Sequence, residues 1–120
     1  MKKQDYLIIS TQPPYSGVLP RAAIDMALTS AAFEQNVAVV FRDQAVAQLT
    51  NGQDTSVSEM KNIGKMIPAL EMYDVQRVCV YAPSLSATGI ESDQLLTDVE
   101  AIGQDELKAM VRKADHVMVY

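Results

Sequence analysis

The only cysteine of the chain, Cys79, is the residue best suited to covalent chemistry, and Arg77 lies two positions before it. Residues two apart in a strand share a face, so the Arg77 guanidinium is expected beside the thiol. A nearby cation lowers the pKa of a thiol and makes the nucleophilic thiolate available at neutral pH. This spacing permits a reactive cysteine.

The surroundings of Cys79 favour a different interpretation. It lies between Val78 and Val80 in the apolar run 75–81, two residues before the end of that run. Free cysteine is among the most commonly buried residue types, and a thiol in apolar surroundings is inert. We expect Cys79 to be a buried structural residue and predict no catalytic residue. Tyr81 shares its face of the strand, lies nearer the loop and is better placed to contact solvent or a partner.

Other chemistry-bearing patterns are missing. The chain has neither G-x-G-x-x-G nor G-x-x-x-x-G-K-[ST], so the usual nucleotide-binding loops are absent. One cysteine and one histidine cannot build a zinc site within the chain, so neither a metal nor a cofactor is expected. Residues 10–17 could form a flavodoxin-like phosphate loop, although Pro13 and Pro14 lack the backbone N–H groups that such a loop uses.

Length and charge exclude several classes of protein. The 120 residues, 48% of them apolar, fit one domain spanning 1–120 with one core. No apolar run approaches the roughly 20 residues that cross a bilayer. Ten scattered basic residues against fifteen acidic ones give a net charge of −5, which disfavours direct binding to nucleic acid. A cytoplasmic protein without membrane contact is expected.

The elements that position these residues alternate between strands and helices. The continuous apolar run 37–41 is typical of a strand in a parallel sheet, buried on both faces. We predict an α/β fold, a three-layer α/β/α sandwich with a mostly parallel sheet of about five strands. The predicted strands are 6–10, 37–41, 75–81, 99–102 and 116–120, and the predicted helices are 20–33, 44–49, 58–67 and 104–112. Pro68 is expected to end or kink its helix, and the Pro/Ser/Gly-rich segment 82–90 to form a loop.

Three tyrosines near predicted strand ends indicate assembly with other chains. Tyr15, Tyr73 and Tyr81 all look exposed, and aromatic residues and methionine are enriched at protein interfaces. The chain also contains seven methionines, although single methionines often fill the core. We predict that the three tyrosines take part in an interface.

Several segments, in order along the whole chain, resemble one known family. They include the Tyr73-Asp74 pair before the third strand and the exit from Ser84-Leu85 to Gly89. Together they resemble the TusC/DsrF branch of the DsrE/DsrF/DsrH-like family. The matching segments are 7–11, 21–28, 40–49, 52–53, 70–75 and 82–90.

The resemblance implies a role in sulfur relay. Members of this family have a three-layer α/β/α fold and form a hetero-hexamer of TusB-like, TusC-like and TusD-like subunits. A TusA-like donor passes persulfide sulfur to a cysteine of the TusD-like subunit, and a TusE-like acceptor carries it toward 2-thiouridine at the tRNA wobble position. The TusC-like subunit is chiefly structural in that scheme.

The sequence departs from its relatives at Tyr81, where several of them carry a cysteine. A phenol, with a pKa of about 10, cannot hold a persulfide. This favours a non-catalytic subunit of a sulfurtransferase complex. Two alternatives stay open: Cys79 itself accepts persulfide sulfur, or the chain is a flavodoxin-like module that binds a small ligand near residues 10–17.

Overall fold

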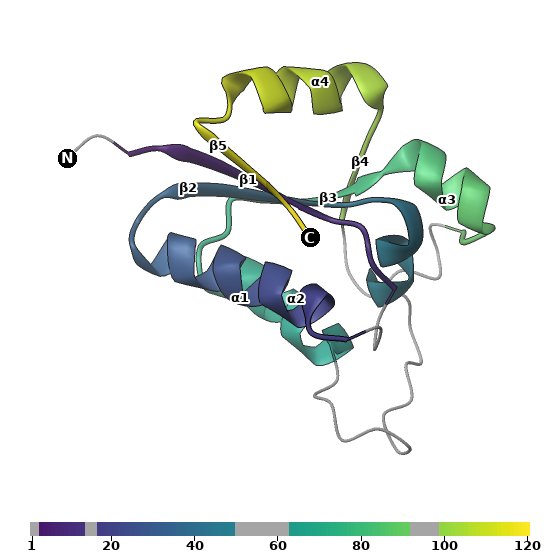
Figure 1. Ribbon diagram of the computed structural model, residues 1–120, viewed down its shortest axis with the longest axis horizontal. Helices are drawn as coiled ribbons and strands as arrows, with labels where there is room; N and C mark the ends of the chain where they lie inside the picture. Colours follow the sequence, from purple (N-terminus) through teal and green to yellow (C-terminus); the bar gives the residue numbers. More distant parts are fainter. Residues whose placement is uncertain (1–2, 14–16, 50–62, 92–98) are drawn as a thin grey trace.

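The computed structural model describes residues 3–13, 17–49, 63–91 and 99–120. A sheet of five strands, all parallel, lies at its centre in the order β4-β3-β2-β1-β5 (Figure 1). The predicted α/β class and parallel sheet are confirmed. Tyr15, the predicted start of a helix at residue 58 and the polar segment 50–56 lie outside the described residues.

The bounds of the elements follow the predicted ones closely, apart from the region around β3. The strands are β1 (Asp5–Ser10), β2 (Asn36–Phe41), β3 (Arg77–Tyr81), β4 (Glu100–Ile102) and β5 (His116–Val119). The helices are α1 (Leu19–Ala32), η1 (Asp43–Leu49, a 3-10 helix), α2 (Ile63–Met72), α3 (Ala82–Thr88) and α4 (Gln104–Lys113).

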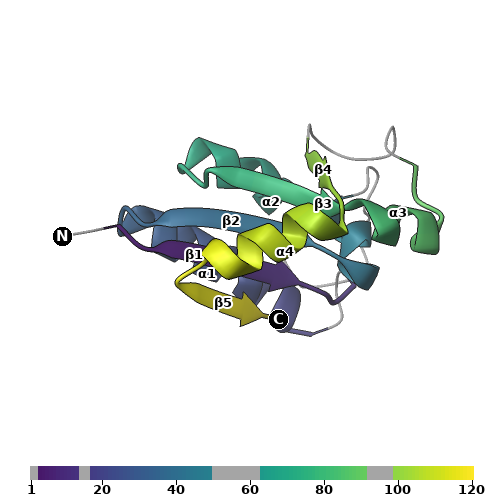
Figure 2. The ribbon, with the colours of Figure 1, turned by 90° about the horizontal axis from the view of Figure 1, so that it is seen from above.

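Helices cover both faces of the sheet, which gives the three layers that were predicted. Helices α1 and α2 lie on one face, and α4, alone among the described helices, lies on the other and crosses above the middle of the sheet (Figures 1 and 2). Each face has its own apolar cluster. The cluster under α4 consists of Leu7, Ile9, Val40, Cys79, Ile102 and Leu107.

The side chains of β3 alternate between these two clusters. Val78 and Val80 pack in the cluster that includes residues of α1 and α2, whereas Cys79 and Tyr81 pack in the cluster under α4. Because β3 lies between β2 and β4, both of its edges are hydrogen-bonded. Cys79 is therefore held in an interior strand, between the sheet and α4.

One prediction about local structure was wrong, and one of the two alternatives expected at Pro68 is excluded. The segment predicted as a loop after β3 forms α3, with Pro83 in its first turn and Gly89 in the left-handed conformation just after its end. Proline is favoured in the first turn of a helix and glycine just past its end, so the same residue types suit a short helix as well as a loop. Helix α2 also continues past Pro68 to Met72. A proline removes one backbone donor, but the turns after it can still form, and the N–H of Tyr73 donates to the carbonyl of Ala69 at 2.9 Å.

Gly89 offers a test of the end of α3. Its φ is +73°, and a Cβ there would meet open space, so the cost of Gly89→Ala comes from the backbone alone. We expect Gly89→Ala to lower the free energy of unfolding by about 1 kcal/mol in urea titration. Gly89→Asn is the matched control, because asparagine tolerates the left-handed conformation better than alanine does, and it is expected to cost less. Equal losses in the two variants would contradict the left-handed end.

No helix among the described residues has the length and apolar character needed to cross a membrane.

Candidate functional site

Cys79 lies in the middle of β3, facing α4, and its exposed fraction is 0%. Its neighbours across the sheet are Val40 on β2 and Glu100 on β4. The thiol donates to Oε2 of Glu100 at 3.8 Å. The predicted burial of this residue is confirmed.

Arg77 does share the face of Cys79, as its spacing predicts, but its guanidinium forms ion pairs with two carboxylates. Its guanidinium donates to Glu100 and, at 2.7 Å, to Oε1 of Glu106 on α4. These bonds raise the pKa of Arg77 above its ordinary value. Neither glutamate is among the residues predicted from the sequence. Only the pairing of β3 with β4 and the position of α4 bring them to Arg77, so the local sequence carries no signal for them.

The pKa of Cys79 follows from these surroundings. Burial raises it from 9.0 to about 12, and the opposing effect of Arg77 is smaller. Glu100 and Glu106 contribute to this rise, because a negative charge nearby disfavours a thiolate. At pH 7 a thiol with such a pKa is ionised in roughly one molecule in 100,000. The activating role that the Arg77–Cys79 spacing permits is therefore not realised in this geometry.

The raised pKa predicts a loss of stability at alkaline pH. Between pH 9 and 12 the unfolded chain releases the thiol proton while the folded chain keeps it, so the free energy of unfolding falls as pH rises. From pH 7 to pH 10 we expect the wild type to lose roughly 1 kcal/mol more than Cys79→Ala, which has no thiol to ionise. Urea titration of both proteins at the two pH values measures this difference. Parallel losses would show that Cys79 ionises as readily in the folded state as in the unfolded one.

The structure separates two of the tyrosines predicted at an interface. Tyr81 ends β3 and is half-buried, with the guanidinium carbon of Arg42 5.4 Å from its ring centroid. Tyr73 follows α2, before the other end of β3, and is 61% exposed. The two residues therefore belong to different surfaces.

Tyr73 borders an apolar groove, which we define by Leu28, Ala31, Ala32, Met72 and Tyr73. Its volume is about 420 Å³, and Glu34 and Asp74 complete its lining. Met72 is 77% exposed, and Phe33, next to the groove in sequence, is 72% exposed. Large apolar side chains that gather in this way on a surface mark an interaction site.

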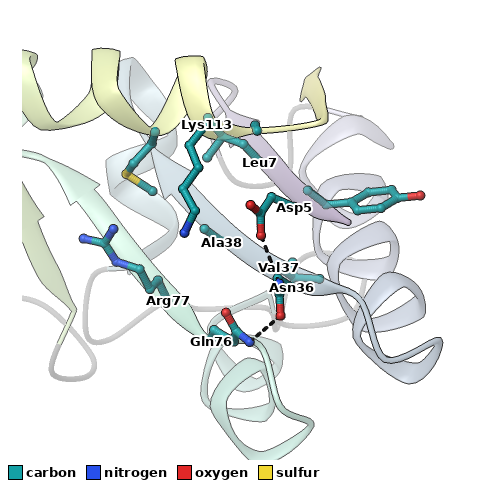
Figure 3. Close-up of a pocket in the computed structure, with 11 residues that line it drawn as sticks. Asp5, Leu7, Asn36, Val37, Ala38, Gln76, Arg77 and Lys113 are labelled. Atoms are coloured by element: carbon teal, nitrogen blue, oxygen red, sulfur yellow. Dashed lines mark hydrogen bonds between the residues drawn. The ribbon is translucent and has the colours of Figure 1, made fainter. Parts of the chain in front are cut away.

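A small cavity lies at the amino ends of the strands, under the end of α4 (Figure 3). There the amide of Asn36 donates to Asp5 at 3.0 Å, and the amide of Gln76 donates to Asn36 at 2.8 Å, while Lys113 reaches down from α4 (Figure 3). The cavity measures about 80 Å³. Small-molecule sites usually exceed roughly 300 Å³, so these polar groups link the strands and are too confined to hold a ligand.

The loop after β1 was considered as a small-ligand site. The hydroxyl groups of its described residues form hydrogen bonds with other parts of the chain. The side-chain amide of Gln48 donates to the hydroxyl of Ser10 at 3.0 Å, and the hydroxyl of Thr11 donates to the carbonyl of Tyr120 at 2.9 Å. Residues 14–16 lie outside the described residues. The two hydroxyl groups thus help to hold η1 and the chain end after β5.

These features define a class of protein. It is a three-layer α/β protein with an all-parallel sheet, a buried thiol in an interior strand and an exposed apolar groove. The DsrE/DsrF-like family model matches residues 4–120. The chain therefore belongs to the DsrE/DsrF-like family.

Individual relatives agree with this assignment. A Protein TusC homolog from Pseudomonas aeruginosa is 34% identical over 115 residues, which cover 96% of this chain and 97% of that one. The intracellular sulfur oxidation protein DsrF from Allochromatium vinosum is 37% identical over 91 residues, 76% of this chain and 67% of that one. Among solved structures, the ychN protein from E. coli superposes with a TM-score of 0.86 at 23% identity and covers 98% of this chain and 99% of that one.

Proposed function

We propose that this chain is a non-catalytic, TusC-like subunit of a sulfur-relay complex. The burial of its only cysteine is the observation that carries the proposal. A relay cysteine needs an accessible thiol with a low pKa, whereas the pKa of Cys79 is raised to about 12. A partner subunit then supplies the thiol that carries the sulfur.

The names of the relatives support a choice of partners. Two of them are named for TusC and for the sulfur oxidation protein DsrF. We propose that the chain acts as a single domain in a cytoplasmic hetero-hexamer with TusB-like and TusD-like subunits, between a TusA-like donor and a TusE-like acceptor. The sulfur would end in 2-thiouridine at the tRNA wobble position, without direct contact between this chain and the RNA.

The apolar groove is the surface that we assign to the partner subunits. It combines a volume of about 420 Å³ with the exposed side chains of Met72 and Tyr73. Aromatic side chains and methionine are the residue types enriched in the cores of interfaces. Tyr73 is thus the predicted interface tyrosine for which the structure offers a suitable surface.

The test is sulfur transfer by the assembled complex. The chain is co-expressed with TusB-like and TusD-like subunits, and transfer of labelled sulfur from a TusA-like donor to a TusE-like acceptor is measured. Because Cys79 takes no part in the proposed relay, Cys79→Ala is expected to change the rate by less than about twofold. Replacing the relay cysteine of the TusD-like subunit is the control and should abolish transfer.

One outcome decides against the proposal. If Cys79→Ala and the near-isosteric Cys79→Ser both assemble normally but stop transfer, Cys79 is the acceptor and the chain is a sulfurtransferase in its own right. Native mass measurement of each complex distinguishes this result from failed assembly.

A further inference from the structure

A second hollow lies at the opposite end of β3 from the apolar groove, at the carboxyl ends of the strands. We call it the basic pocket and define it by Arg42, Tyr81, Gln104, Leu107, Lys108, Val111 and Arg112, which line a volume of about 390 Å³. Arg42 follows β2 directly, Tyr81 ends β3, and the other residues lie on α4. In parallel α/β sheets this edge is the usual place for ligands.

Three cations and no carboxylate line the basic pocket, within a chain whose net charge is −5. Arg42 forms an ion pair with Asp43, with its Nε 3.5 Å from Oδ2. Within the described part of the chain, neither Lys108 nor Arg112 forms an ion pair. They are four residues apart on α4, a spacing at which like charges destabilise a helix slightly. The fold therefore gathers three cations at this edge, and of these only Arg42 has an ion-pair partner among the described residues.

The wall between these cations is apolar. Val111 is 42% exposed, Leu107 is almost fully buried beneath it, and the ring of Tyr81 completes the lining. A ligand that fills the pocket must offer negative charge at its rim and an apolar group at its centre. This combination is common in acidic peptides, in which carboxylate and aliphatic side chains alternate.

We propose that the basic pocket binds a short acidic peptide segment of a partner protein. Carboxylates of the segment would pair with Arg42, Lys108 and Arg112, and an aliphatic side chain would rest on Val111 and Tyr81. A long nucleic acid fits less well, because the net charge of −5 repels a polyanion beyond the pocket. The proposal does not depend on sulfur relay and uses a surface other than the apolar groove.

The binding test uses the full chain and a fluorescent peptide of alternating glutamate and leucine. Fluorescence anisotropy at low salt gives its affinity, and the same peptide with glutamine in place of glutamate is the control ligand. We expect at least about tenfold weaker binding of the glutamine peptide, because its interactions with the cations lose their charge.

Variants of two adjacent residues of α4 locate the site. Arg112→Gln is expected to weaken binding of the glutamate peptide by about fivefold, a typical effect for one partly exposed charge pair. Lys113→Gln is the matched control: it removes the same charge from the same last turn, but Lys113 lines the cavity at the amino ends of the strands. It should change the affinity by less than about twofold.

Three results would overturn the proposal: equal affinity for the glutamate and glutamine peptides, equal losses in the two variants, or tighter binding of a single-stranded RNA of the same charge. A measurement on the wild type avoids any concern about folding of the variants. In NMR titration, peptide-induced shifts at the amides of Tyr81 and Gln104 support the site, and shifts confined to other regions exclude it.

Discussion

Replacing both Phe33 and Tyr73 by glutamate is expected to weaken binding of the chain to its partner subunits by at least about a hundredfold. Both aromatic side chains are largely exposed, at 72% and 61%; Tyr73 lines the apolar groove, and Phe33 lies in sequence between two residues that line it. Docking of a partner would bury the two introduced glutamates without partners for their charges, which makes binding at this surface strongly unfavourable. Since the side chains support little of the core, the stability of the isolated chain should change by less than about 1 kcal/mol.

A control variant separates the effect of the groove from that of added charge. Val18→Glu combined with Val119→Glu adds the same two charges at exposed apolar residues, at 77% and 65%, away from the groove. Native mass measurement after co-expression should show a complete complex for this control and unassembled subunits for the groove variant. A groove variant that assembles like the control would refute the assigned interface.

Leu107→Ala is expected to lower the free energy of unfolding by about 3 kcal/mol, the middle of the range for a buried leucine. Leu107 is the one residue of α4 that is buried, at 7% exposed, and it packs in the cluster that contains Cys79. Its truncation leaves a cavity and loosens the only helix on that face of the described structure. Urea titration gives the loss, and faster alkylation of Cys79 by iodoacetamide should accompany it.

Val111→Ala is the matched control for the anchoring of α4. Val111 lies one turn further along the same helix but is 42% exposed, so its truncation should cost less than about 1 kcal/mol. If the two variants lost equal stability, or if the thiol of Leu107→Ala stayed protected, α4 would not be held through Leu107.

Local sequence was ambiguous where a short segment mixes helix-terminal and loop residues. Pro83 and Gly89 predicted a loop, yet Pro83 lies in the first turn of α3 and Gly89 lies just after its end. Pro68 predicted either the end of a helix or a kink, and α2 continues past it to Met72. In both places the residue types suit two local structures, and packing against the rest of the fold selects one of them.

The sequence by itself determined the fold class and the number of thiols. Continuous apolar runs such as 37–41, alternating with helical patterns, are sufficient to predict a parallel sheet covered on both faces, because burial on both faces leaves no polar alternation in a strand. The single cysteine likewise restricts any sulfur chemistry of this chain to Cys79.

The tertiary structure alone decided how Cys79 is tuned and where the surfaces lie. Sequence spacing placed a cation beside the thiol, but Glu100 and Glu106 form ion pairs with Arg77, and the effect of burial on the pKa of Cys79 outweighs that of Arg77. Tyr73 and Tyr81 are eight residues apart in sequence yet belong to separate surfaces. The basic pocket joins residues from β3, from α4 and from just after β2. Such contacts depend on the order of the strands and the placement of the helices. Both are determined by contacts between segments that lie far apart in the sequence.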